Sequence, residues 1–271
     1  MNNLAKLRVL YNKFLSQISY ENFRRFLRNP YLIFSFFRTF RAALKRENID
    51  TVNQRAQVPQ MLSKIFDVCE EDVEEYMEEF EDLEYFQHSF EDKWRDLEKA
   101  GALGGTAGKL DCQIMYVVCR IQEPDVVVET GVRYGAFDSH ILAALDKNGS
   151  GKLYSIDLPD AVNEFDYGYL VSQKLMDRWE FRKGNSLNVL PELMKDLNNI
   201  DIFLHDSLHV PKHIRNEYNA VYPYLEDEAI LASHDIYMTD TFQEFVKEKD
   251  MENVIINNIG IGIKDKVSDQ K

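Results

Sequence analysis

Histidines and aspartates gather in two short segments, each at the end of an apolar run. One segment extends from His205 to His209 and follows the apolar run 202–204; the other is Ser233-His234-Asp235. In open α/β folds, ligands bind beyond the carboxyl ends of parallel strands. If both apolar runs are neighbouring strands, their polar ends meet and form one reacting site.

Two mechanisms fit this cluster. In the first, His209 is a general base that removes a proton from a hydroxyl group, because a neutral imidazole suits that task near pH 7. In the second, Asp206, His234 and Asp235 bind a divalent cation, Mg²⁺ or Mn²⁺, which orients the hydroxyl and lowers its pKa. We predict His209 and Asp206 as catalytic residues.

A glycine-containing loop precedes this cluster in the chain. The apolar run 126–128 leads into Glu129-Thr130-Gly131-Val132-Arg133-Tyr134-Gly135, and a helix is predicted to begin at Ala136. Gly131 allows a sharp turn, and Gly135 allows the loop to approach a ligand. The pattern ExGxxxG alone is weak evidence for a nucleotide site. Because it lacks the second glycine of GxGxxG, it argues against NAD as the ligand.

Two further strand ends follow in the order that an adenosine site needs. Asp157 ends the next predicted strand, where a carboxylate can accept the ribose hydroxyls. The turn Gly184-Asn185-Ser186 follows the third strand and would lie beside the adenine edge, although Asn185 is nearly as well explained as a helix cap.

Taken together, these motifs resemble the class I S-adenosylmethionine-dependent methyltransferases, specifically methyltransferase family 24. The resemblance covers about residues 103–264 and is carried by segments 127–132, 153–159, 178–186 and 203–209. It implies cofactor contacts at the glycine loop, at the two following strand ends and at Asp206. We therefore predict S-adenosylmethionine contacts at Glu129, Thr130, Gly131, Tyr134, Gly135, Asp157, Leu158, Asn185, Ser186 and Asp206.

The resemblance also implies O-methylation of a sugar, glycan or small-molecule hydroxyl, metal-assisted in some members. Three departures from the family pattern stand out. Asn185 replaces an acidic residue, 225–229 replaces a Pro-Gly-Gly turn, and His234 stands where relatives often have Asp. Two other hypotheses stay open: a non-catalytic nucleotide-binding or interaction module of the same fold, and an NAD-dependent oxidoreductase.

Alternating helices and short β-branched strands must position these residues. Such alternation is typical of a parallel sheet with crossover helices. The last two strands are too close for a crossover helix, so we expect an antiparallel hairpin at the sheet edge. The predicted fold is a Rossmann-like α/β methyltransferase sheet, with strands at 125–130, 153–157, 179–183, 200–205, 229–233, 254–257 and 259–264.

The first hundred residues differ in character and form a predicted N-terminal helical extension, with the methyltransferase domain at 101–271. Residues 1–50 hold ten Lys/Arg against three Asp/Glu, whereas residues 51–100 hold five against fifteen. The basic, aromatic segment 23–46 could contact a membrane surface, or pack on the acidic segment or on a second copy of the chain. A single amphipathic helix is predicted from about Glu70 to Lys99, with one apolar stripe.

Composition narrows the remaining classes. The net charge of −14 disfavours nucleic acid as a partner. The three cysteines have no metal or disulfide spacing, which fits a reducing compartment. No segment has the pattern of a secretory signal or a membrane span. We therefore expect a cytoplasmic protein, with membrane association depending on residues 23–46.

Overall fold

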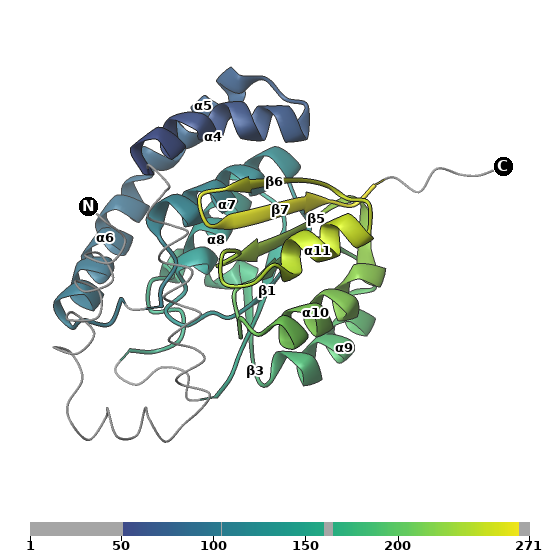
Figure 1. Cartoon of the computed structure of the whole chain (residues 1–271). Coiled ribbons are helices and arrows are strands. Elements are labelled where there is room, and N and C mark those ends of the chain that lie inside the picture. Colours follow the sequence, from purple (N-terminus) through teal and green to yellow (C-terminus); the bar gives the residue numbers. More distant parts are fainter. Residues whose placement is uncertain (1–50, 104, 160–164, 266–271) are drawn as a thin grey trace, which may run out of the picture. The chain divides into compact units, whose positions relative to one another are not determined.

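The computed structural model describes residues 51–103, 105–159 and 165–265 (Figure 1). These residues fall in one compact unit that spans residues 49–271. The basic segment 23–46, with its predicted membrane or subunit contact, lies outside the described residues. Among the residues that are described, no helix is both long enough and apolar enough to cross a bilayer.

A seven-stranded sheet forms the centre of this unit, with strand order β3-β2-β1-β4-β5-β7-β6. The first five strands pair in parallel, and β7 pairs antiparallel to both β5 and β6. The predicted parallel sheet with an antiparallel edge hairpin is therefore confirmed. The strands are β1 (Val126–Thr130), β2 (Lys152–Asp157), β3 (Trp179–Lys183), β4 (Ile200–His205), β5 (Leu225–His234), β6 (Glu252–Ile256) and β7 (Ile259–Ile263).

Helices cover both faces of the sheet, which explains the nearly continuous apolar runs of its strands. Val127 contributes to the core under α7 (Lys109–Gln122) and α8 (Ala136–Asn148). Its neighbour Val128 contributes to the opposite core, under α9 (Ser186–Leu197), α10 (Pro211–Val221) and α11 (Thr241–Glu248). In Figure 1, α9, α10 and α11 lie in front of the sheet and α7 and α8 behind it.

Two connections differ from the predicted alternation of helices and strands. Between β2 and β3, the described residues contain only a short 3₁₀ helix, η1 (Gln173–Arg178), rather than an α-helix. A second 3₁₀ turn, η2 (Tyr222–Tyr224), leads into β5. That strand begins at Leu225, earlier than predicted, because its first polar residues, 226–228, are exposed and hide the apolar strand pattern.

The acidic segment forms two helices rather than the predicted single one. They are α5 (Glu70–Glu81) and α6 (Glu84–Lys99), separated at Asp82 and Leu83. Leu83 has an extended backbone, but its side chain is buried. The predicted apolar stripe therefore continues across the break, and periodicity alone could not reveal that the helix ends there.

The helix before them, α4 (Thr51–Phe66), lies against α5, α7 and the edge strand β6. Its Val58 and Leu62, with Val73 of α5, are fully buried in the same core as α7. The helices between 51 and 99 are thus part of the unit that contains the sheet. Whether residues 101–271 fold by themselves, as the predicted domain division implies, stays a prediction.

Candidate active site

A pocket of about 380 Å³ opens at the carboxyl ends of the parallel strands. The chain passes from β1 to β2 on one side, whereas β4 lies on the other side, so the strand order reverses here. Such a switch point is where open α/β sheets bind ligands. The pocket is lined by Gly105, Gly131, Arg133, Ile156, Asp157, Leu158, Gly184, Asn185, Ser186, Asp206, Ser207, Leu208, His209 and His213.

Gly131 is the point of closest approach between the β1 and β4 ends. Its φ is +95°, and a Cβ built there would lie 2.3 Å from the carbonyl oxygen of Asp206. Its amide donates to Ile156 O at 2.8 Å, while the Asp206 amide donates to Thr130 O at 2.8 Å. Only glycine fits this backbone and this spacing, so the loop that the sequence predicted is built around Gly131.

Asp157 lies at the pocket wall, as predicted, but its carboxylate is already engaged. Oδ2 accepts from the amides of Val132 (2.9 Å) and Arg133 (2.8 Å), and Oδ1 accepts from the Leu158 amide (2.7 Å). A carboxylate offers about four lone-pair sites. Asp157 can therefore accept one ribose hydroxyl at Oδ1 while it keeps the loop in place, rather than both hydroxyls as the sequence suggested.

The turn after β3 caps a helix and also reaches the pocket. Asn185 lines the pocket, and its Oδ1 also accepts from the Leu187 amide at 3.0 Å as the N-cap of α9. The Ser186 hydroxyl is 3.2 Å from Nε2 of His213. The side-chain NH₂ of Asn185 is therefore left for a ligand. Ser186 instead joins the polar network that includes His213.

Four residues of the predicted cofactor site do not line the pocket. Glu129, Thr130 and Tyr134 are buried, and Gly135 is the N-cap of α8 and lies close to Gly168. Burial and the neighbouring carboxylate of Asp138 raise the pKa of Glu129 well above its ordinary value. The structure therefore places these four residues behind the wall of the pocket, where they shape the loop.

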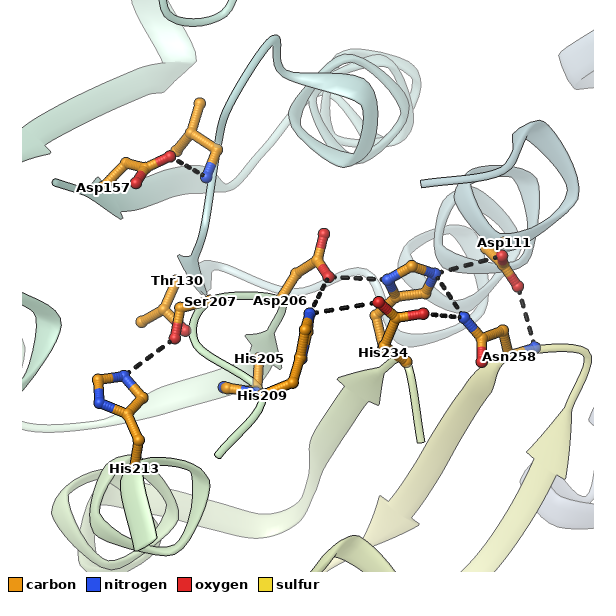
Figure 2. Close-up of polar contacts among 12 residues, drawn as sticks. Asp111, Thr130, Asp157, His205, Asp206, Ser207, His209, His213, His234 and Asn258 are labelled. Atoms are coloured by element: carbon orange, nitrogen blue, oxygen red, sulfur yellow. Dashed lines mark hydrogen bonds and ion pairs between the residues drawn. The ribbon is translucent and has the colours of Figure 1, made fainter. Parts of the chain in front are cut away.

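At the other end of the pocket, Asp206, His209 and Asp235 come together. Figure 2 shows Asp206 and His209 pointing toward one another. Nε2 of His209 is 3.3 Å from Oδ2 of Asp235 and 3.8 Å from Oδ1 of Asp206. One ligand atom from each residue falls within 4.8 Å of the others, a spacing that would suit a cation. The predicted convergence of the β4 and β5 ends is therefore present in the structure.

His234 does not face this convergence point, in contrast to the predicted metal set. Its Nδ1 is 2.7 Å from Oδ1 of Asp206, and its Nε2 is 3.3 Å from Oδ2 of Asp111 on α7. Because both ring nitrogens are engaged, His234 has no nitrogen left for a cation. The residue that joins Asp206 and Asp235 in a metal-like arrangement is His209.

The charges of this cluster depend on one another. Burial raises the pKa of Asp206, and the nearby His234 partly opposes that rise. Burial also disfavours a charged His234, yet Asp206 and Asp111 hold the pKa of this imidazole well above its ordinary value. His234 is therefore an imidazolium between the carboxylates of Asp206 and Asp111. This contact fixes one oxygen of Asp206 and leaves its other oxygen for the pocket.

A second polar network, missed by the sequence analysis, supports the pocket floor. Glu217 is fully buried and accepts from Thr130 (2.9 Å) and Ser207 (2.8 Å). It also contacts Nδ1 of His205 at 2.5 Å and Nε2 of His213 at 2.9 Å. The spacing of His213 and Glu217, four residues apart on a predicted helix, was the available signal.

Comparisons with known proteins bear on residues 128–236 and on the fold. Residues 128–236 match methyltransferase family 24, described as a methyltransferase domain, which confirms the resemblance. A methyltransferase from Geobacter sulfurreducens is similar in fold, with 17% identity and a TM-score of 0.52 over 64% of this chain and 86% of the other. No curated protein matches the sequence.

Two ligand-bound structures have the same fold. One is an S-adenosylhomocysteine-bound methyltransferase from Podospora anserina, with 11% identity, a TM-score of 0.52, and coverage of 66% of this chain and 88% of the other. The second is an O-methyltransferase of tomaymycin synthesis from Streptomyces achromogenes, in complex with S-adenosylmethionine, with 10% identity, a TM-score of 0.52, and coverage of 66% and 90%. At these identities the likeness establishes the fold.

Proposed function

We propose that this chain, whose residues 128–236 match methyltransferase family 24, transfers a methyl group from S-adenosylmethionine to a hydroxyl of a sugar, glycan or small-molecule acceptor. The observation that supports this most directly is the composition of the pocket. At one end lie Asp157 and Asn185, whose side chains can hydrogen-bond to an adenosine, and at the other end lie Asp206 and His209.

The residues present fit an adenosine ligand. The pocket volume of about 380 Å³ lies in the range of small-molecule sites. Asp157 has one lone-pair site left for a ribose hydroxyl, and Asn185 has its amide group. Asp206 has one oxygen left after its bond to His234. When bound, the donor supplies an electrophilic methyl group on a sulfonium.

The chain's own contribution is to remove the acceptor proton and to hold the acceptor in line. His209 Nε2 lies near two carboxylate oxygens, so a positive charge is favourable at that position. In the base route, the neutral imidazole of His209 takes the acceptor proton at Nε2, and the carboxylates of Asp235 and Asp206 stabilise the imidazolium that forms. A cation there would be held by Asp206, His209 and Asp235 and would lower the pKa of the acceptor hydroxyl.

Isothermal titration with S-adenosylmethionine tests the donor. We expect saturable binding, and the absence of binding at millimolar ligand would refute the proposal. Labelled donor incubated with fractionated cell extract would then identify the acceptor. Repeating the transfer assay with EDTA separates the two routes, because loss of activity that Mg²⁺ or Mn²⁺ restores requires a cation, whereas unchanged activity leaves His209 as the base.

A further inference from the structure

Arg133 stands out because it gives the pocket a fixed positive charge. Among the described residues that line the pocket, it is the one arginine or lysine, and the same lining contains two carboxylates, Asp157 and Asp206. The methyl donor carries a carboxylate on its methionine part, and that group needs a cationic or N–H partner in a partly buried site. The other residues of the pocket lining with a permanent charge, Asp157 and Asp206, are acidic and cannot serve.

The chain holds Arg133 in a strained and specific position. Its φ is +47°, outside the region that side-chain-bearing residues prefer. Its amide is fixed by Oδ2 of Asp157 at 2.8 Å, and its carbonyl accepts from the Gly168 amide at 3.2 Å. Such strain persists only where the surroundings enforce it, and it is concentrated at ligand sites.

The guanidinium itself is positioned but not satisfied. Nη2 donates to the carbonyl of Ala102 at 3.3 Å, and the group lies 5.0 Å from the ring centre of Tyr134. Gly105 comes so close that a Cβ there would be 3.3 Å from Nη1. The buried Nε has no hydrogen-bond partner, and no carboxylate of the described residues pairs with the group. A buried donor without a partner is costly, so the chain's own groups leave this guanidinium incompletely satisfied.

The sheet order indicates which part of a donor would meet this group. Asn185 and Ser186 follow β3, Asp206 follows β4, and β1 lies between β2 and β4. A residue in the loop after β1 therefore lies between the adenosine end and the reacting end. The part of the donor that falls there is the ribose and the methionine chain, of which the methionine carboxylate is the anion.

We infer that Arg133 binds the methionine carboxylate of the methyl donor, an inference that rests on the proposed function. The interaction is a charge-assisted hydrogen bond from the guanidinium to the carboxylate oxygens. A carboxylate on the acceptor would offer the same chemistry, so the test compares two donors that differ only in this group.

The experiment titrates the full chain with S-adenosylmethionine and with decarboxylated S-adenosylmethionine. We expect the wild type to prefer the carboxylate form by about 10- to 100-fold, the range of a charged hydrogen bond. Arg133→Met should remove this preference by weakening S-adenosylmethionine binding while leaving the decarboxylated form within about threefold. Arg133→Lys keeps the charge without the planar fork and should retain an intermediate preference.

Arg182→Met is the matched control, because Arg182 lies on β3 and pairs with Glu180 away from the pocket. It should leave both affinities unchanged, and circular dichroism confirms that each variant folds. The assignment would be overturned if Arg133→Met lost the same affinity for both ligands, or if it kept the wild-type preference for the carboxylate form. If the wild type binds neither ligand, it is the proposed function that fails.

Discussion

At the scale of single residues, His209 is the side chain on which the proposed chemistry depends. Replacing it with Ala should lower the turnover number by about 10²- to 10⁴-fold, the usual contribution of a positioned acid–base group. Affinity for S-adenosylmethionine should change by less than about threefold, since the change lies at the reacting end of the pocket. Methyl transfer and titration calorimetry measure the two quantities on the same sample.

Lys212→Ala is the control for this variant, because Lys212 is exposed at the start of α10 close to the site. It should behave as the wild type does. A His209→Ala variant with full turnover would remove the residue from the mechanism, whereas a large loss of donor affinity would show that it binds the cofactor instead.

Glu217 carries a prediction about pH. Its pKa is held well below the ordinary value of 4.5: burial works against the charge, but His205, His213 and Ser186 outweigh it. A lowered pKa in the folded state contributes stability that is present above about pH 4.5 and is lost as the pH falls toward the folded value. Glu217→Gln should therefore cost about 1–3 kcal/mol near pH 7, because an amide cannot replace every hydrogen bond that the carboxylate accepts and leaves buried donors unpaired.

Urea unfolding of wild type and Glu217→Gln across pH 4 to 8 measures this difference. The difference in unfolding free energy between the two proteins should narrow as the pH falls below about 4.5. Glu98→Gln, at an exposed position on α6, should show no gap at any pH. A gap that widens toward acid would contradict the assigned charge state of Glu217.

The sequence predicted well which residues gather at the site. It did not predict which residues they hydrogen-bond with. Asp206, His209 and Asp235 could be placed together because each follows a recognisable apolar run. The bond between His234 and Asp111 joins residues 123 positions apart, and no local pattern reports such a contact. The metal set was therefore predicted with His234, whereas the structure points His209 at the same position.

At the scale of elements, the turn from β1 to α8 can be tested with two glycines. Gly131 and Gly149 both have positive φ, but only Gly131 has backbone atoms in the space that a Cβ would fill. Ala at either position costs about 1–2 kcal/mol of backbone strain. Gly131→Ala should cost about 1–3 kcal/mol more through overpacking, and it should also weaken donor binding.

Thermal unfolding and titration with S-adenosylmethionine measure these effects, with Gly149→Ala as the matched control. Equal effects of the two substitutions would show that the close approach of the β1 and β4 ends is not required.

The strands could be predicted to within a few residues because β-branched runs and turn residues mark them locally. Helix ends were harder. The break at Asp82 contains no glycine or proline, and buried Leu83 continues the apolar face of α5. The early start of β5 was hidden for a related reason, since its exposed acidic residues 226–228 leave no apolar signal.

At the scale of the whole molecule, the described helices before the sheet should be required for folding. Removing residues 1–48 should leave a protein that unfolds cooperatively and binds the donor as the full chain does. Removing residues 1–100 deletes α4, α5 and α6 and exposes the core that Val58, Leu62 and Val73 complete. Each such side chain contributes about 1.5–3 kcal/mol when buried, so this shorter chain should not fold.

Circular dichroism and chemical unfolding of the two truncated chains check this prediction. A chain of residues 101–271 that folds and binds the donor would instead support the domain division predicted from the sequence, and it would show that the helices from 51 to 99 are an accessory layer.

The contact between α4 and β6 has a consequence for self-association. β6 is an outer strand of the sheet, and an outer strand carries backbone N–H and C=O groups that can pair with a strand of another molecule. With α4 lying against this strand, an incoming chain would have to displace a helix before it could add to the sheet. Helix α4 thus protects the sheet edge besides packing, and a variant that detaches it from β6 without unfolding the core should self-associate through sheet extension.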